Sequence, residues 1–524
     1  MINRRKWLRY LLGLFMILSF AFGIRLKNLT LIPVFADEAI YVRWSQVMRA
    51  VPTLHFLPLS DGKQPLFMWS VIPFLKIFND PLFAGRLVSV ICGTGTIVVV
   101  ALTSLFVFGS FEISLISASL IAFSPFNFFF DRFALADSML TFWSSAAILG
   151  SIMTAKLRRL DASMITGFLL GFALLTKSPA QIIAILLPLS FIFYPPPKIN
   201  IIYVLKHLVL LVPIYLIAFG IYGILRLGPE FHMIALRNRD YVFSLGEVLS
   251  HPLNPLVSNL RISWSYLTYF LTLPIVFLSV LSLFIVKGKK PYHIFILAAL
   301  PVLAQGLIAK VLTARYLLYI TPWLIILAAV SLYKFSSNIS LFRQGKTIVL
   351  TLLIVLILPI IYIVKLTISP ESLNDMPQSE RTGYFEIWTA GYGLKEVGEY
   401  LRIEAKTGKN ILVGTEGYFG TLPDGLQMYL NGIENVRIIG IGLYPDKVPD
   451  PLTNSLVDND VYLVINDSRI SINNPKSEGL ILIASYPKAI NLNGQREKLL
   501  FFKVLPKPGN NLPKSAKSSI GHES

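Results

Sequence analysis

Long apolar runs separated by short polar loops constrain this chain more than any other feature. A helix that crosses a bilayer needs about 20 consecutive, mostly apolar residues. About eleven runs meet or approach that length, near residues 8–24, 86–108, 113–130, 138–154, 162–176, 179–194, 203–225, 263–286, 292–309, 315–333 and 347–366. Soluble domains usually have about 25% charged residues, whereas this chain has 15%, with 54% hydrophobic residues. The sequence therefore predicts a polytopic α-helical membrane protein.

The apolar segment 66–78 is a poor candidate for a further span. It is too short to cross a bilayer, and Pro65 and Pro73 interrupt it. We expect it to lie at the membrane interface or to re-enter the same face. The runs 162–176 and 179–194 are also marginal by length, so their division is open.

The distribution of basic residues predicts how the chain is oriented. Its basic start, MINRRKWLRY, leads into the first apolar run without a small-residue cleavage site, which indicates an uncleaved first helix with a cytoplasmic N-terminus. Alternate loops counted from there are basic, such as those carrying Lys156 and Lys289, as the positive-inside rule requires. A crossing at 66–78 would destroy this agreement. We therefore expect a multi-pass protein of the cell (plasma or inner) membrane, with the large first loop outside.

The character of the sequence changes after about Ser369. Short apolar runs near 410–414, 436–441 and 461–466 alternate with Gly, Pro and Asn turns, and 395–405 has helical periodicity. These features predict a small α/β domain. The expected organisation is a transmembrane domain over 1–368 with outer loop 26–85, an extracytoplasmic domain over 369–505, and a disordered tail over 506–524.

Charge and cysteine content exclude several classes of protein. A net charge of +18 would suggest nucleic acid in a soluble chain, but here the excess lies in short loops, where it sets topology or meets anionic lipid. The single cysteine, Cys92, excludes an intrachain disulfide and is most simply a packing residue. Gly93 and Gly95 lack the strand–turn–helix context of a phosphate-binding loop and favour helix packing instead.

A polar island over 34–66 interrupts the apolar runs and begins with the adjacent acids Asp37 and Glu38. Two solvated acids are the ordinary interpretation of such a pair. The pair directly follows a span, however, and begins a helix-like stretch, where a carboxylate near the N-terminus is favoured electrostatically. A carboxylate partly desolvated at a membrane surface is also more basic. We therefore treat both as candidate site residues, with Asp37 first.

Asp131, Arg132 and Asp137 follow three phenylalanines at an expected outer helix end. They are either an interfacial ion pair in an aromatic belt or a phosphate site. In the second case the planar fork of Arg132 would bind phosphate and Asp137 would orient it. The sequence favours neither alternative.

Further cations are expected on the same outer side. Lys177 interrupts two apolar runs, and Arg86 and Arg315 each begin a span. Each has an ordinary role as a snorkelling or end-anchoring residue. Ionisable residues at membrane depth are nevertheless functional candidates, and converging cations would suit the phosphate of a lipid carrier.

The remaining candidate is His251, in the expected outer loop 227–262. A lone histidine is more often structural, so we keep it only as a supporting residue. No spacing of histidines and carboxylates specifies zinc. We therefore predict no metal and no other cofactor.

Together these stretches resemble the membrane glycosyltransferases of the GT-C type, in the branch that contains protein O-mannosyltransferases and aminoarabinose transferases. Four stretches carry most of the likeness: Asp37-Glu38-Ala39 with Tyr41, Asp61-Gly-Lys-Gln-Pro-Leu-Phe-Met-Trp69, Asp131-Arg-Phe-Ala-Leu-Ala-Asp-Ser138, and Gly171-Phe-Ala-Leu-Leu-Thr-Lys-Ser-Pro179. The triplet starting at Arg315 also resembles the family's Arg-Tyr-Leu. The likeness covers roughly residues 8–335.

The resemblance implies an inverting hexosyl- or pentosyltransferase that moves a sugar from a polyprenyl-phosphate carrier to an envelope acceptor. The acceptor is expected to be a lipid, a polysaccharide or a protein. Asp37 matches the family's base, which takes the acceptor's hydroxyl proton, and Glu38 would shape the same pocket. The leaving phosphate needs cations more than a proton donor. Candidates for that role are Lys63, Arg86, Arg132, Lys177 and Arg315, with Asp131, Asp137, Tyr41 and His251 in support.

Three positions depart from the family's pattern. Gln64 replaces the first proline of its Gly-Lys-Pro-Pro, and Ser178 replaces the glycine of its Thr-Lys-Gly-Pro. Gly62 stands where aminoarabinose transferases have a glutamate, which argues against a metal bridge there.

Two alternatives to a transferase stay open. A transporter or flippase of lipid-linked saccharides would often show paired repeats and broken helices, and no repeat is visible in the sequence. An inactive envelope assembly protein would bind a partner through its C-terminal domain and would tolerate substitution of Asp37 and Lys63.

Overall fold

The computed structural model describes residues 4–194, 201–338 and 344–507. Within them the chain forms two compact units. The first, here the helical unit, comprises residues up to 31 together with 47–79 and 83–380. The second, here the sheet unit, comprises 32–46, 80–82 and the chain from 381 onwards. The expected tail, 506–524, lies outside the described residues from position 508.

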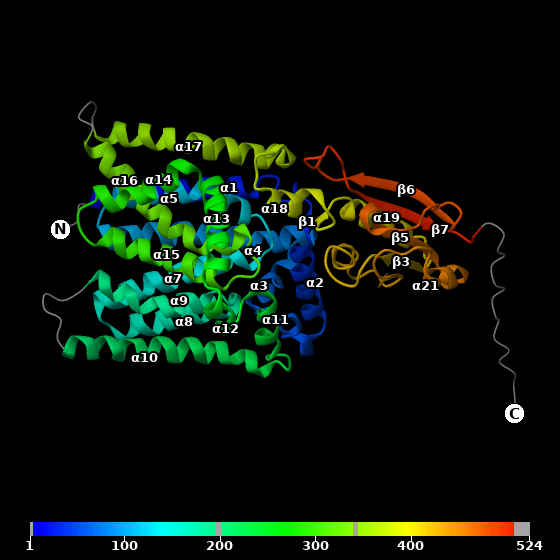
Figure 1. The fold of residues 1–524 in the computed structure, drawn as a ribbon, viewed down its shortest axis with the longest axis horizontal. Coiled ribbons are helices and arrows are strands. Elements are labelled where there is room, and N and C mark those ends of the chain that lie inside the picture. Colours follow the sequence, from blue (N-terminus) through cyan, green and yellow to red (C-terminus); the bar gives the residue numbers. More distant parts are fainter. Residues whose placement is uncertain (1–3, 195–200, 339–343, 508–524) are drawn as a thin grey trace. The chain divides into compact units, whose positions relative to one another are not determined.

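The helical unit is built mainly from long apolar helices that run side by side (Figure 1). In chain order the helices of this unit, long and short, include α1 (Arg4–Leu26), α3 (Leu66–Val71), α4 (Pro81–Phe108), α5 (Phe111–Ala122), α6 (Pro125–Phe130), α7 (Ala136–Leu157), α8 (Leu160–Thr176), α9 (Ala180–Leu186), α10 (Ile201–Gly223), α11 (Met233–Tyr241), α12 (Leu245–Ser250), α13 (Leu253–Phe270), α14 (Leu273–Ile285), α15 (Lys290–Ile308), α16 (Thr321–Asn338) and α17 (Gln344–Ile368). Helix α8 packs against both α7 and α10, and α16 packs against α5, α14 and α15. Helices suit such sequences because they satisfy every backbone polar group internally.

The number of helices long enough to span a membrane is smaller than expected. Seven helices in the described residues meet the length and hydropathy requirement, or eight if one bent pair counts as a span. Three of the predicted spans, 113–130, 162–176 and 179–194, are instead shorter apolar helices. The first is divided because Ser124 caps a new helix with Pro125 at its first position. The count of about eleven spans is therefore not confirmed.

The predicted continuous span over 263–286 is also wrong in detail. Helices α13 and α14 meet there at an angle of 111°. Thr272 adopts a left-handed φ of 68°, and Pro274 lies in the first turn of α14 and has no N–H to continue the ladder of α13. The bend lies at these residues. The segment 66–78 forms α3 and a short 3₁₀ turn, too short to span.

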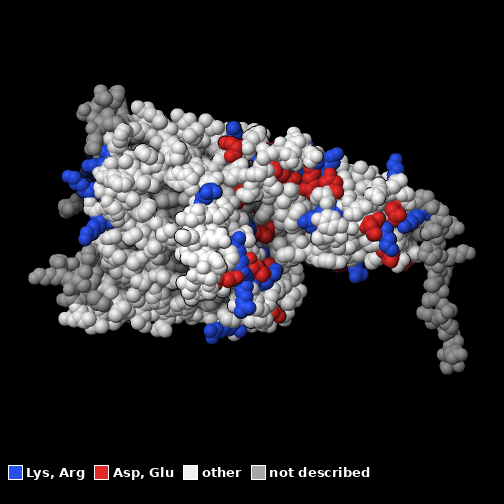
Figure 2. All heavy atoms as spheres, viewed as in Figure 1, with Lys and Arg blue, Asp and Glu red and all other residues white. Residues whose placement is uncertain are grey.

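The surface of the helical unit is typical of a membrane protein. The flank shown in Figure 2 is broadly free of charge, and lysine and arginine gather at its left end. Loop residues such as Lys287 and Lys289 are exposed. An uncharged flank between polar ends is what contact with lipid tails requires.

The sheet unit contains the α/β domain that the C-terminal sequence predicts. Its strands are β3 (Ile411–Thr415), β4 (Val436–Gly440), β5 (Asp460–Asn466), β6 (Leu480–Pro487) and β7 (Lys498–Val504), in the order β4-β3-β5-β7-β6. Strand β3 is parallel to β4 and β5, while β7 is antiparallel to β5 and β6. Helices α19 (Leu394–Ala405), α20 (Asp424–Tyr429) and α21 (Asp450–Asn454) accompany the sheet.

The core of this unit follows from its sequence pattern. Val397, Leu401 and Ala405 lie four residues apart on α19 and are all buried, as an amphipathic helix on a sheet requires. Every residue of β3 is buried, as expected for a central strand covered on both faces. The strands predicted near 410–414, 436–441 and 461–466 and the helix near 395–405 are confirmed.

A segment from the first loop folds with the sheet unit. Strand β1 (Val34–Phe35) pairs antiparallel with β2 (Ala390–Gly391). The first part of α2 (Ala36–Ala50) belongs to the same unit as far as Gln46. The acidic stretch that begins the polar island is thus a structural part of the α/β domain.

Candidate functional site

The two acids of the first loop lie in the first turn of α2, but in different surroundings. Glu38 is fully buried, and its Oε2 accepts the Phe35 N–H at 2.9 Å. Its carboxylate thereby closes the turn that starts the helix, in the manner of a capping residue. Asp37 is partly exposed. Of the two, only Asp37 presents a side chain that is accessible to another molecule.

Several contacts within the sheet unit hold the start of α2. The Ala36 N–H donates to the Thr389 carbonyl at 3.0 Å, beside the β1–β2 pair. The side-chain amide of Gln46 donates to the Met428 carbonyl at 2.9 Å, and Arg43 donates to the Asn431 side chain at 2.8 Å. Tyr41 is buried and stacks on Trp44 with ring centroids 6.2 Å apart. The C-terminal domain therefore fixes the helix that carries Asp37.

In the helical unit, the centre of the predicted cation set is Lys177. It follows α8 with an extended backbone (φ −165°, ψ 147°), which turns the chain out of the helix. Its Nζ lies 2.6 Å from Oδ1 of Asp137 and 4.5 Å from the centroid of the Tyr316 ring. The guanidinium of Arg315 lies 5.6 Å from the same ring centroid. One aromatic ring thus links two cations that are far apart in the sequence.

A second acid, Glu380, belongs to this group. It is buried and accepts the Ala314 N–H at 2.9 Å. Burial raises the pKa of Glu380, the Ala314 N–H and Arg315 lower it, and Asp137 raises it further. The hydrogen bond to Ala314 places the Glu380 carboxylate beside the residue that precedes Arg315. Lys177, Arg315, Asp137, Glu380 and Tyr316 form one charged cluster, here the lysine cluster.

The predicted Lys63 motif reaches the same part of the helical unit. The side-chain amide of Gln64 donates to the Ser178 hydroxyl at 2.9 Å, across 114 residues of sequence. Lys63 itself forms an ion pair with Asp61 at 3.0 Å, and Arg237 also binds Asp61. Two of the three residues that depart from the family's pattern, Gln64 and Ser178, are therefore hydrogen-bond partners. Their bond places the Lys63 motif beside the residue that follows Lys177.

Arg132 and Arg86 belong to a separate, fully buried cluster around the end of α1. Arg132 donates to the Asn28 carbonyl at 2.7 Å, and Arg86 donates to the Leu29 carbonyl at 2.8 Å. Their guanidinium groups also lie 5.2 Å from the ring centroids of Phe128 and Phe133, respectively. Arg86 and Arg132 thus hold the segment that leads from α1 towards the acidic loop.

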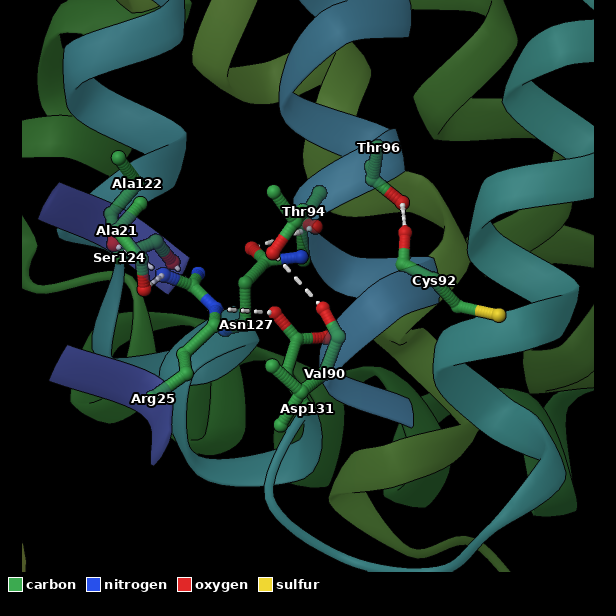
Figure 3. Close-up of polar contacts among 11 residues, drawn as sticks. Ala21, Arg25, Val90, Cys92, Thr94, Thr96, Ala122, Ser124, Asn127 and Asp131 are labelled. Carbon is green, nitrogen blue, oxygen red and sulfur yellow. Dashed lines mark hydrogen bonds and ion pairs between the residues drawn. The ribbon is translucent and has the colours of Figure 1, made fainter. Parts of the chain in front are cut away.

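The partner of Asp131 is Arg25, as Figure 3 shows. Nε of Arg25 lies 3.0 Å from Oδ2 of Asp131, and Nη1 donates to the carbonyls of Ala21 and Ala122. Gly93 gives Asp131 room, since a Cβ there would lie 2.1 Å from the carboxylate. A Cβ on Gly95 would in turn meet the Phe142 ring at 2.7 Å. Both glycines therefore serve close helix packing, as the sequence indicates.

The structure brings together some of the predicted residues and separates others. Lys177, Arg315 and Asp137 meet in the lysine cluster. Arg86 and Arg132 bind neighbouring carbonyls after α1, and Asp131 pairs with Arg25 on α1. Asp137 pairs with Lys177 and not with Arg132, contrary to one of the two interpretations above. His251 lies exposed at the end of α12, with Nδ1 3.1 Å from the hydroxyl of its neighbour Ser250.

Two participants were missed by sequence reasoning. Arg25 lies at the end of the first apolar run, where a charged residue is ordinary. Nothing in the sequence indicates that it pairs with Asp131, 106 residues away. Glu380 lies in a polar stretch without a motif. Among the described residues no group of three or more His, Cys, Asp or Glu side chains is arranged to hold a metal ion.

The fold and part of the sequence are similar to known proteins. Residues 57–219 match the family model described as dolichyl-phosphate-mannose-protein mannosyltransferase. That stretch includes the Lys63, Arg132 and Lys177 motifs, but neither Asp37 nor Arg315. No curated protein matches the chain in sequence.

Solved structures resemble the chain over nearly its full length. The apo structure of ArnT from Cupriavidus metallidurans matches with a TM-score of 0.56 and 14% identity, covering 93% of this chain and 97% of that one. The same protein bound to undecaprenyl phosphate matches with a TM-score of 0.55 and 14% identity, covering 95% and 98%. The chain therefore has an ArnT-like fold, a helical membrane unit followed by an α/β domain. The predicted resemblance agrees with this fold and with the mannosyltransferase family match over residues 57–219.

Proposed function

We propose that this protein is an inverting glycosyltransferase that moves a sugar from a polyprenyl-phosphate carrier to an envelope acceptor on the outer face of the membrane. The ArnT-like fold and the mannosyltransferase family match support a donor of this class. In this proposal neither a metal nor another cofactor takes part. The acceptor is a lipid, a polysaccharide or a protein.

The reaction would require one base and a set of cations. Asp37 takes the proton from an acceptor hydroxyl as that oxygen attacks the anomeric carbon. The bond between the anomeric carbon and the phosphate oxygen breaks, and the carrier phosphate leaves as an anion. Glu38 contributes by holding the turn that presents Asp37, since its own carboxylate is buried on the Phe35 N–H.

The cations divide into two groups according to their exposure. Lys63, Lys177 and Arg315 are partly exposed, and we assign them direct contact with the leaving phosphate. Arg86 and Arg132 are fully buried on backbone carbonyls, so in this proposal they add positive potential without touching the phosphate. Charge-assisted contacts of this kind often supply about 10²–10³ in rate each.

The observation that carries the proposal is the lysine cluster. Lys177, at the end of α8, and Arg315, in a later part of the chain, flank the Tyr316 ring beside Asp137 and Glu380. A purely structural lysine at a helix end would be expected to snorkel to water. Here the lysine is held at 2.6 Å by Asp137, which can release it when a phosphate competes for the charge.

The test is transfer by the purified full-length protein in lipid nanodiscs. Several polyprenyl-phosphate sugars are supplied with an envelope extract, and products are identified by mass spectrometry. Asp37→Asn is expected to abolish transfer with folding intact, while the exposed control Asp458→Asn keeps wild-type activity. Normal turnover by Asp37→Asn would refute its role as base.

One observation favours a second candidate, a flippase of lipid-linked saccharides. The broken pair α13–α14 is a feature that transporters also show. Movement of labelled polyprenyl-phosphate sugar across vesicles, without any product, would support the flippase and would overturn the transferase.

A further inference from the structure

We propose that the carboxyl edge of the parallel strands in the sheet unit is a binding site for the neutral saccharide part of the acceptor. This inference rests on the proposed function, because it names what the transferase would hold beside its base. It concerns the loops 416–421, 441–446 and 467–470, here called the edge loops.

The order of the strands creates a switch point in this sheet. The chain passes from β3 through α20 to β4 on one side, and then through α21 to β5 on the other side of β3. The order of connection therefore reverses between β3 and β5. Open α/β sheets bind ligands outside the carboxyl ends of their strands at such a switch point. Glu416 directly follows β3 and Asn466 ends β5, so these two residues mark the switch point.

Backbone hydrogen bonds join the three edge loops to one another. The Gly417 N–H donates to the Gly442 carbonyl at 3.0 Å, which joins the first loop to the second. The Tyr444 N–H donates to the Arg469 carbonyl at 3.1 Å, which joins the second loop to the third. These bonds bring side chains from three separate parts of the sequence to one edge of the sheet.

This edge of the sheet exposes aromatic rings. Tyr418 is 75% exposed and Tyr444 is 58% exposed, with Phe419 and Leu443 beside them in sequence and also exposed. Tyr418 lies over the end of β4, since a Cβ on Gly440 would meet its ring at 2.5 Å. The Cδ1–Cε1 side of the ring thus lies close to Gly440, while the side chain as a whole stays accessible. Tyr444 holds its position with a left-handed φ of 56°, an unfavourable conformation for a tyrosine.

A charged network joins the ends of β3 and β5 at the same edge. Glu416 accepts both the backbone N–H and the side-chain amide of Asn466, at 2.6 and 2.8 Å. Lys488 donates to the same Asn466 side chain at 2.5 Å and pairs with Glu497 at 3.7 Å. Arg469 lies 3.7 Å from Glu416 and stacks on Trp388, 3.9 Å from the ring centroid. The network fixes the edge loops and supplies polar groups at their base.

Charge decides which ligand class this edge suits. Arg469 and Lys488 are balanced by Glu416 and Glu497, so the edge has no cationic surplus for a phosphate, a nucleotide or an anionic lipid headgroup. Tyrosine combines an apolar ring face with a hydroxyl. One face of a pyranose carries C–H bonds that suit the negative face of an aromatic ring, while its hydroxyls need hydrogen-bonding partners. A neutral saccharide meets both requirements.

A contact within the same unit connects this edge to the proposed base. The Phe419 ring lies 5.9 Å, centroid to centroid, from Trp44. Trp44 is on α2, two turns after Asp37. A saccharide on the edge loops would therefore lie next to the helix that carries the base. This is the position that an acceptor requires.

The experiment measures saccharide binding and transfer separately, with the full-length protein in nanodiscs. The probes are neutral manno-, gluco- and galacto-oligosaccharides, with binding followed by saturation-transfer difference NMR. The test variants are Tyr418→Ala, Tyr444→Ala and their combination. The controls are Ile403→Ala, which removes an exposed side chain from α19, and Asp37→Asn.

The expected result is that at least one oligosaccharide binds the wild type, Ile403→Ala and Asp37→Asn, and that the double tyrosine variant binds at least tenfold more weakly. In transfer assays the same variant raises the KM for the acceptor about tenfold, with kcat and the KM for the donor unchanged. Saccharide binding by Asp37→Asn tests the two proposals separately. If Asp37 is not the base, the edge loops would still be expected to bind the saccharide.

The inference is overturned if no neutral oligosaccharide binds, or if the tyrosine variants bind as the wild type does. It is equally overturned if the variants lose affinity only for anionic phospholipid vesicles or for a protein. To exclude misfolding, the tyrosine variants must keep the thermal unfolding midpoint of the wild type. Should Tyr444→Ala unfold, Tyr444→Gly, which suits a positive φ, replaces it in every comparison.

Discussion

At the scale of single residues, the pair Gln64–Ser178 explains two departures that the sequence presents as separate. The family's pattern has proline and glycine at these positions, neither of which can make a side-chain hydrogen bond. Here the side-chain amide donates to the hydroxyl at 2.9 Å. Because Gln64 is buried, removing its partner would leave a polar group unpaired, which usually costs about 1–3 kcal/mol.

We predict that Gln64→Ala and Ser178→Ala are not additive. Each should lower the free energy of unfolding by about 1 kcal/mol, and the double variant should lose less than the sum by about 0.5–1 kcal/mol. Thermal unfolding of the purified variants measures this coupling. Pairing Gln64→Ala with the exposed control Ser372→Ala should give additive effects. Additive losses for Gln64 and Ser178 would show that the bond does not contribute.

A second residue-scale prediction concerns Lys488, which is almost fully buried. Burial lowers its pKa from 10.5 to about 8, although Glu497 and Glu416 act in the opposite direction. Between these two values the unfolded chain binds a proton that the folded chain does not, so stability rises with pH from about 8 to 10.5 and is lost as pH falls through the same range. From pH 7 to 10 the wild type should gain up to about 3 kcal/mol relative to Lys488→Met. Unfolding curves of both proteins at pH 7 and pH 10 measure this difference in stability. The same pH dependence in the wild type and in Lys488→Met would contradict the prediction.

At the scale of elements, the start of α2 depends on the C-terminal domain more than on its own neighbours in sequence. Strand β1 pairs with β2, and Gln46 binds the Met428 carbonyl. Gly425 on α20 lies against the same helix, since a Cβ there would be 3.5 Å from that of Ala39. A larger side chain at this point must displace either Leu394 or the helix that carries Asp37.

We therefore predict that Gly425→Val lowers kcat for transfer by at least tenfold, because small displacements of a catalytic group are costly. The matched control is Gly383→Val, where a Cβ meets nothing within 4 Å and activity should persist. Steady-state kinetics give kcat and KM, and thermal unfolding checks the fold. An unchanged kcat in Gly425→Val would show that this contact does not position the base.

At the scale of the whole molecule, orientation in the membrane follows from charge. The exposed basic loop around Lys289 should face the cytoplasm under the positive-inside rule, and the sheet unit should be extracytoplasmic. The single, buried Cys92 makes this testable, because Cys92→Ala removes the only thiol.

In that background we predict that a membrane-impermeant maleimide labels Leu492→Cys in intact cells but labels Lys289→Cys only after permeabilisation. Both positions are exposed, so access differs only by side. Labelling efficiency is read by mass shift on a gel. The reverse pattern would place the C-terminal domain in the cytoplasm and would remove the basis for transfer outside.

The sequence by itself determined the features that depend on local pattern. Apolar runs gave the helices because length and hydropathy decide whether a segment suits a membrane, and alternation with turn residues gave β3, β4 and β5. The motifs also pointed to Lys177 and Arg315, which lie at the same Tyr316 ring. Breaks such as the one at Thr272 were missed because one proline in an apolar run changes the hydropathy very little.

Tertiary structure alone decided which side chains meet. Asp131 could pair with any nearby cation in the sequence, yet it binds Arg25 across 106 residues. Asp137 pairs with Lys177 rather than with Arg132. Glu380 belongs to the lysine cluster although no sequence motif marks it. The acidic loop folds with the C-terminal sheet unit. Such pairings depend on how helices and strands pack, because distance along a chain says little about distance in space once the chain has folded.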